Sequence, residues 1–224
     1  MSAPREHLIR AVAPAVELRA EDSDESPGTL YGHFAVFDQW TEIHSWFEGD
    51  FVERIAPGAF ADTFREDRDA MRVLYDHGHD PTLGNKPLGP IADLREAKRG
   101  AYYEEPLLDP DYNRDFLVPA VRGLRNLGGV LGASFRFSVR EDHWVDEPEP
   151  SEHNPRGLPE RTIHSVRNYE MGPVTFPAYG GTDQGIRSTD LTAYYIERQL
   201  GDEEARAALV ELYPSLRNLA VDVA

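Results

Sequence analysis

The chain contains no cysteine, few basic residues and no long apolar run. Without cysteine it cannot form a disulfide framework, use a thiolate nucleophile or hold zinc through sulfur. Its 23 Lys and Arg residues against 40 Asp and Glu residues give a formal charge of −17, which repels nucleic-acid backbones and anionic lipid surfaces. Because no stretch approaches the roughly 20 apolar residues that span a bilayer, we expect a soluble, unexported protein that binds neither nucleic acid nor membrane.

The 224 residues are 40% hydrophobic and 10% aromatic, which is enough to build the core of one domain. An acidic stretch with Ser, Pro and Gly, EDSDESPG at residues 21–28, predicts that residues 1–28 form a flexible N-terminal arm. The β-branched and aromatic run TLYGHFAVF, from Thr29 to Phe37, then predicts the first strand.

The rest of the chain mixes strand and helix patterns. Short apolar runs bounded by Gly, Pro and Asp predict strands, whereas residues 110–129 carry apolar side chains at helical spacing with Pro119 near a first turn or at a kink. The Pro-rich, acidic stretch from Asp142 to Glu160 predicts a solvent-exposed excursion. We expect an α+β, β-rich single domain over residues 29–188, followed by a helical C-terminal tail over residues 189–224.

A few chemically capable residues lie among apolar neighbours: Ser134, His77, Glu170 and His164. A serine becomes a nucleophile when an imidazole accepts its proton and a third polar group orients that imidazole. Local sequence alone favours a tightly packed serine, an ordinary loop or strand histidine and a solvated glutamate.

The HGHD sequence permits a third interpretation of His77. With His79 and Asp80 it would supply the first ligands of a metal-dependent hydrolase. This ligand set is incomplete, so a metal site is the less favoured hypothesis.

Five segments from Tyr31 to Ser188 resemble, in this order, the hallmark blocks of the tailed-bacteriophage prohead proteases. They are GHFAVFDQ, FVERIAPGAFADTF, RVLYDHGHDPTLGNKPLGPI, LVPAVRGLRNLGGVLGASFRF and RNYEMGPVTFPAYGGTDQGIRS. The resemblance implies a serine endopeptidase without a cofactor, whose fold is similar to that of the herpesvirus capsid-assembly proteases, with a mostly antiparallel sheet or barrel flanked by helices.

Matching those blocks implies that His77 is the general base, Ser134 the nucleophile and Glu170 the third catalytic residue. His164 is the alternative third member, since the herpesvirus relatives use a histidine there. Arg136 is a weaker candidate for supporting the oxyanion through a water molecule.

The resemblance also implies partners and a location. The enzyme would lie inside the procapsid in the host cytoplasm, cleave the major capsid protein and its scaffolding segment, cleave itself and possess a packaging element in the tail. Self-association is a further expected property. The competing hypothesis, from another functional class, is a catalytically idle capsid-assembly or scaffolding protein that retains the fold.

Overall fold

The computed structural model describes residues 5–12, 16–19, 27–45, 48–81, 83–108, 110–126 and 132–174. Its strands are β1 (Leu8–Val12), β2 (Val16–Arg19), β3 (Thr29–Val36), β4 (Thr41–Ser45), β5 (Gly49–Ile55), β6 (Arg72–Val73), β7 (Asp93–Glu96), β8 (Gly100–Pro106), β9 (Gly132–Val145) and β10 (Glu160–Val174). The helices are α1 (Ala61–Glu66), α2 (Val118–Asn126), the 3-10 turns η1 (Arg68–Ala70) and η2 (Tyr75–Gly78), and the π-helical η3 (Tyr112–Leu117). No helix within these ranges is long and apolar enough to cross a membrane.

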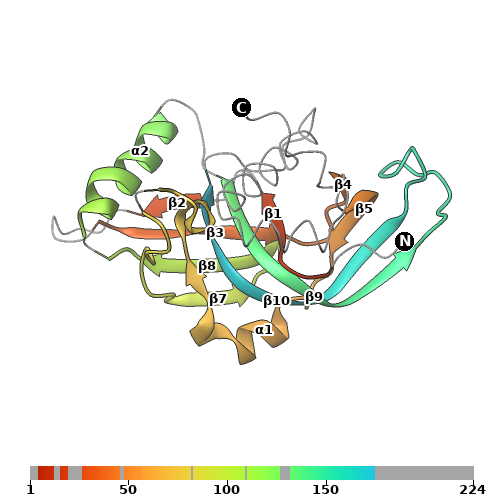
Figure 1. The fold of residues 1–224 in the computed structure, drawn as a ribbon, viewed down its shortest axis with the longest axis horizontal. Helices are drawn as coiled ribbons and strands as arrows, with labels where there is room; N and C mark the ends of the chain where they lie inside the picture. The colour runs from red at the N-terminus through yellow and green to blue at the C-terminus, as the bar shows by residue number, and fades with distance from the viewer. Residues whose placement is uncertain are drawn as a thin grey trace, which may run out of the picture. The chain divides into compact units, whose positions relative to one another are not determined.

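The described strands form two open sheets. One has the order β1-β9-β10-β5-β4, with β6 also pairing with β10, and the other has the order β2-β3-β8-β7. Figure 1 shows the long strands β9 and β10 side by side, and they pair antiparallel along most of their length. The β-rich expectation is therefore confirmed, and neither described sheet closes into a barrel.

An aromatic core packs against one face of β9. The ring of Phe135 lies 5.6 Å from both Phe34 of β3 and Phe60, which immediately precedes α1. Since side chains alternate along a strand, the buried Phe135 and Phe137 place Ser134 and Arg136 on the opposite face of β9. The sequence pattern thus gives β9 one face for the core and one for polar groups.

Two strands lie within residues 1–28, where we expected a flexible arm. β1 pairs antiparallel with β9 and β2 with β3, so the fold begins well before Thr29. The expectation of a flexible arm is wrong for residues 8–12 and 16–19, because these short segments pair with the edges of the two sheets. Most of the acidic stretch at residues 21–28 lies outside the described residues. The tail at residues 189–224 lies outside the described residues.

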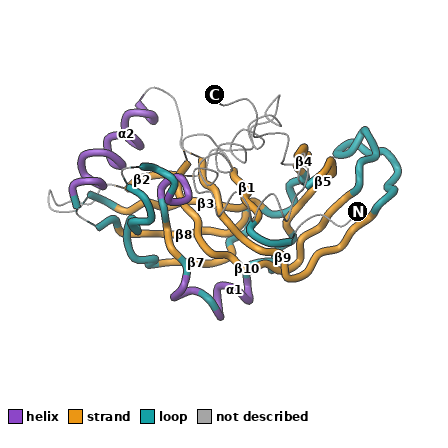
Figure 2. The backbone as a smooth tube through the Cα atoms, viewed as in Figure 1, coloured by secondary structure: helices purple, strands orange, loops and turns teal. Residues whose placement is uncertain are grey.

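The Pro-rich excursion is shorter than its composition indicated. Asp142 to Val145 continue β9 and pair with β10, so the turn lies between the two long strands, as Figure 2 shows. In the helical segment, η3 runs directly into α2, and Pro119 is the second residue of α2. Pro119 therefore lies inside a continuous helical run, next to its π-helical part, and not in a free first turn.

Candidate active site

Three neighbouring elements carry the residues expected to be catalytic. Ser134 is on β9, Glu170 is on β10, and His77 follows β6, which pairs with β10 at Glu170 and Met171. On β10, Gly172 lies directly opposite Ser134 and Glu170 directly opposite Arg136. Glu170 is therefore a diagonal neighbour of Ser134 on the same face of the sheet, at a separation of about 7 Å.

A glycine lets the histidine segment approach this face. A Cβ atom at Gly172 would lie 1.9 Å from the carbonyl oxygen of Leu74, closer than any real contact. Leu74 also donates its backbone N–H to Met171, at 2.9 Å. The backbone between β6 and His77 thus lies directly against β10, because residue 172 has no side chain.

The chain then turns sharply in η2. Asp76 and His77 have φ values of 46° and 57°, and Gly78 follows with φ 75°. Such left-handed backbone is unfavourable for residues with a side chain and persists where the surroundings enforce it. A Cβ at Gly78 would lie 2.1 Å from the Asn85 side chain, so glycine is needed there as well. The turn directs His77 onto β10.

His77 and Glu170 form a buried hydrogen-bonded pair. The distance from His77 Nδ1 to Glu170 Oε1 is 2.7 Å, and the side chains are 6% and 2% exposed. When Nδ1 carries the proton and donates it to the carboxylate, Nε2 of the neutral ring is left as an acceptor. This is the tautomer that a general base for a serine requires.

A positive charge lies on the other side of Glu170. Arg136 Nε is 3.7 Å from Glu170 Oε1, beyond hydrogen-bond length but close enough for an electrostatic attraction. The second oxygen of Glu170 is buried without a hydrogen-bond partner among the described residues. His77 therefore provides the hydrogen bond that anchors this carboxylate.

The neighbouring Asp76 is half-buried in the same turn. Burial raises the pKa of Asp76, His77 opposes the shift, and the carboxylates of Asp80 and Glu170 reinforce it. The carboxyl groups of Asp76 and Glu170 thus both interact with the imidazole of His77, from different environments. The one that is hydrogen-bonded to the ring is Glu170.

Ser134 is buried, 2% exposed, and its hydroxyl is engaged elsewhere. Ser134 Oγ donates to the backbone carbonyl of Arg10 on β1, at 2.8 Å. In the described part of the chain no hydrogen bond joins Ser134 to His77. The structure brings His77 and Glu170 into contact and places Ser134 on the adjoining strand.

The alternative candidates lie differently. His164 is exposed on β10, six residues before Glu170, at an irregularity in the pairing with β9. The His79 ring is 6.2 Å from that of His77, and Asp80 Oδ1 accepts the backbone N–H of Leu83. Within the described ranges, no three His, Asp or Glu side chains cluster in a way that could hold a metal ion.

Sequence reasoning missed Arg10 and Gly172. Arg10 was assigned to a flexible arm, and nothing in its neighbourhood signals that its carbonyl reaches Ser134. Gly172 precedes a proline near the end of β10, and a glycine inside a strand can indicate a close backbone approach.

Comparisons with known proteins assign a family to the chain. Residues 14–195 match the family model described as caudovirus prohead serine protease. Among solved structures, the chain is similar to the capsid assembly protease of bacteriophage T4, with 12% identity, coverage of 77% of this chain and 98% of that one, and a TM-score of 0.43. A search of curated proteins finds no match.

Proposed function

The chain belongs to the caudovirus prohead serine protease family, and we propose that Ser134, His77 and Glu170 form its catalytic triad. The chain is thus a serine endopeptidase of capsid maturation, as the sequence motifs led us to expect. The observation that supports this choice of residues is the buried hydrogen bond of 2.7 Å between His77 and Glu170, beside the strand that carries Ser134.

The proposed roles follow from the chemistry of the three side chains. Ser134 attacks the scissile carbonyl carbon, and its proton passes to Nε2 of His77. His77 then returns that proton to the leaving amine, and a water molecule deacylates the enzyme by the same route. Glu170 accepts the Nδ1 proton in a hydrogen bond, which orients the ring and stabilises the imidazolium.

Glu170 is preferred to His164 as the third residue. Glu170 contacts His77 and is 2% exposed, whereas His164 is exposed to solvent. A charged partner that is removed from water interacts more strongly with the imidazolium than an exposed one does.

We propose that Arg136 interacts with the substrate or with a water molecule near the reacting groups. It lies two residues beyond Ser134 on the same face of β9, with a side chain that is 37% exposed and therefore open to a substrate or a water molecule. Support of the oxyanion through a water molecule is compatible with this position. A single donor to an oxyanion typically contributes about 3 to 4 kcal/mol.

Members of this family act on proteins of the prohead. For this chain we propose the major capsid protein and its scaffolding segment as substrates, and the interior of the procapsid in the host cell as the location. Cleavage of itself, self-association, a fold related to the herpesvirus capsid-assembly proteases and a packaging role for residues 189–224 belong to the same proposal.

The test is co-expression of the chain with the major capsid protein of its phage. Ser134→Ala and His77→Ala should leave the scaffolding segment uncut, as judged by gel and mass spectrometry. Ser165→Ala, which changes a half-buried serine on β10, is the matched control and should cleave normally. Normal processing by Ser134→Ala would show that Ser134 is not the nucleophile.

A further inference from the structure

β1 lies along the strand that carries Ser134. Leu8 to Val12 pair antiparallel with Phe137 to Ala133, and Ala11 lies directly opposite Ser134. β1 is the outermost strand of its sheet, whereas the other neighbour of β9 is the internal strand β10. The protein's own N-terminal segment therefore occupies the accessible edge of the strand that carries the proposed nucleophile.

The contact between β1 and Ser134 opposes catalysis. The Ser134 hydroxyl donates its one proton to the Arg10 carbonyl, at 2.8 Å. A serine that is activated by His77 must donate that proton to Nε2 of the ring instead. The Arg10 carbonyl also lies beside Oγ, where the carbonyl of a scissile peptide bond would have to come.

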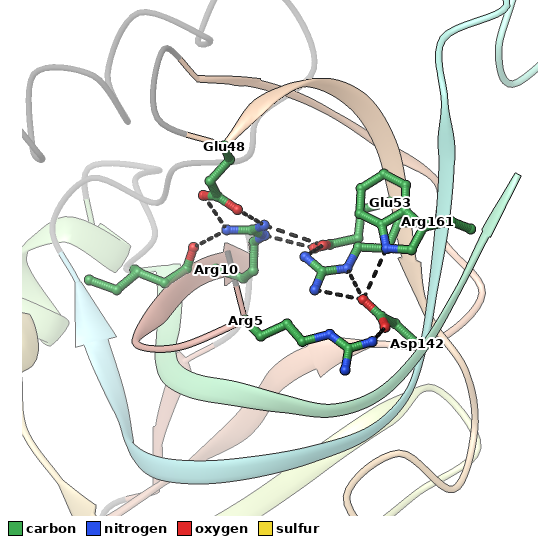
Figure 3. A network of polar contacts seen from close by, with 8 residues as sticks. Arg5, Arg10, Glu48, Glu53, Asp142 and Arg161 are labelled. Atoms are coloured by element: carbon green, nitrogen blue, oxygen red, sulfur yellow. Dashed lines mark hydrogen bonds and ion pairs between the residues drawn. The ribbon is translucent and has the colours of Figure 1, made fainter. Parts of the chain in front are cut away.

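The side chain of Arg10 anchors β1 in this position. Arg10 is buried, and it donates to Glu48 at 2.7 and 3.0 Å and to Glu53 at 2.7 and 3.2 Å. Figure 3 shows its guanidinium between the two carboxylates. Hydrogen bonds between ionised groups are about twice as strong as those between neutral groups.

Further ion pairs adjoin the contacts of Arg10. Arg161, which is fully buried, pairs with Glu53 at 3.3 Å and with Asp142 at 2.8 Å, and Arg5 also contacts Asp142 (Figure 3). Burial disfavours ionisation of Asp142, but the charges and hydrogen bonds of Arg161, with help from Trp144 and Arg5, outweigh it and lower its pKa. The carboxylate of Asp142, which holds Arg5, is thus ionised at neutral pH.

A second set of contacts holds the residues before β1. Val139 donates its backbone N–H to the Arg5 carbonyl at 2.7 Å, and His7 donates its N–H to Ser138 Oγ at 3.2 Å. The His7 ring stacks on Tyr169 of β10, with centroids 5.4 Å apart. Residues 5–12 are therefore fixed along β9 from Val139 to Ala133.

The family match begins at residue 14, after the end of β1. β1 is thus additional to the part of the chain that the family model describes. We propose that β1 is an inhibitory strand: it restrains Ser134 through the Arg10 carbonyl, and it must leave β9 before a substrate strand can bind there. This inference rests on the proposed role of Ser134 as the nucleophile.

The experiment loosens β1 without altering the triad. Within the described residues the Glu48 carboxylate pairs with Arg10, whereas Glu53 also holds Arg161, so Glu48→Gln weakens the Arg10 anchor and leaves the Arg161 pair intact. The matched control is Glu42→Gln, which removes an exposed carboxylate that pairs with Arg156 on the surface. Each purified full-length variant is tested for amide hydrogen exchange in β1 and for the rate of capsid-protein cleavage.

We expect Glu48→Gln to speed exchange in β1 and to raise the cleavage rate several-fold, and Glu42→Gln to do neither. A synthetic peptide of residues 5–12 should then inhibit the Glu48→Gln enzyme in trans, and the same peptide with Arg10→Ala should inhibit it less. Unchanged exchange in Glu48→Gln would overturn the role of the Arg10 anchor. Faster exchange without faster cleavage would overturn inhibition by β1.

A double variant separates this inference from the proposed function. Glu48→Gln with Ser134→Ala should have no activity. If it still cleaves, the assignment of Ser134 as the nucleophile fails. If it is inactive while Glu48→Gln cleaves no faster than the unaltered chain, the assignment of Ser134 stands and β1 is only a structural strand.

Discussion

Two buried glutamates, one in each sheet, differ in what surrounds their carboxyl groups. Glu170 on β10 is 2% exposed and accepts a hydrogen bond from His77 at 2.7 Å. Glu105 on β8 is fully buried, and among the described residues neither of its oxygens has a hydrogen-bond partner of ordinary geometry. Burial alone therefore does not distinguish a functional carboxylate from a structural one, whereas the partner does.

The two carboxyl groups differ in their electrostatic partners. Burial raises the pKa of Glu105 well above its usual value, and the backbone N–H of Gly89 opposes the shift only weakly. A carboxyl group that is removed from water and has no cation nearby takes up a proton instead of remaining ionised. Glu170, by contrast, faces both His77 and Arg136.

The largest expected difference is in activity. Glu170→Gln should lower the cleavage rate by roughly 10⁴-fold, because an amide in place of the acceptor carboxylate favours the wrong tautomer of His77. Glu105→Gln makes the same chemical change in the other sheet and should leave the rate within about twofold. The rates are compared on the same capsid-protein substrate, with His164→Ala as a test of the alternative third residue. Equal losses in the two glutamine variants would remove the distinction between these sites.

A smaller effect on activity is expected when the backbone segment between β6 and His77 is displaced. Gly172→Ala and Gly100→Ala each place a Cβ atom 1.9 Å from a carbonyl oxygen, that of Leu74 in the first case and that of Ala35 in the second. Both should lower the unfolding free energy by about 1 to 3 kcal/mol, since a packed backbone must shift. Only Gly172→Ala, which displaces the segment that leads to His77, should reduce the activity of the molecules that remain folded.

Urea unfolding monitored by circular dichroism, with activity corrected for the folded fraction, separates the two effects. If Gly100→Ala loses as much corrected activity as Gly172→Ala does, the proposed role of Gly172 in positioning His77 is contradicted. Gly100 pairs β8 with β3 in the other sheet, so it serves as a control for strain alone.

The last effect concerns the pH dependence of stability and leaves the cleavage rate almost unchanged. The pKa of Glu105 is raised in the folded chain, so its contribution to stability is complete below the usual value of 4.5 and declines as pH rises, because the unfolded chain loses the proton first. The decline is about 1.4 kcal/mol per pH unit until the pKa of the folded state is reached. Glu105→Gln should remove this decline.

Urea titrations at several values between pH 5 and pH 8 measure that slope. Glu104→Gln is the neighbouring control: Glu104 is hydrogen-bonded to Tyr102 and its pKa is lowered, so its removal should not flatten the curve. The same pH dependence in the unaltered chain and in Glu105→Gln would mean that Glu105 is ionised in the fold.

Much of the β-rich fold was predictable from local patterns. The alternation around Ser134 predicts β9, and Gly100 between two apolar runs predicts the turn between β7 and β8, both of which the structure contains. The position of β1 was not predictable, because the sequence of a five-residue strand does not determine which sheet edge it joins.

The sequence allowed us to predict which residues form the candidate site, but not how they contact one another. Local sequence gave no reason to prefer Ser134 and His77 over packed or solvated residues, and their assignment came from a resemblance. The contact between His77 and Glu170 depends on a left-handed turn at Asp76 and on the close approach at Gly172. Both features depend on pairing between segments about 100 residues apart.

The most direct test of the proposed triad is reaction of the chain with a fluorophosphonate probe, which labels activated serines, followed by peptide mass spectrometry. The experiment is run on the unaltered chain and on Glu48→Gln, each with and without His77→Ala. We predict a single labelled residue, Ser134, that is modified faster in Glu48→Gln and is not modified when His77 is replaced. Labelling of another serine, labelling of Ser134 that is independent of His77, or no labelling in either chain would contradict the assignment of Ser134 as a nucleophile activated by His77.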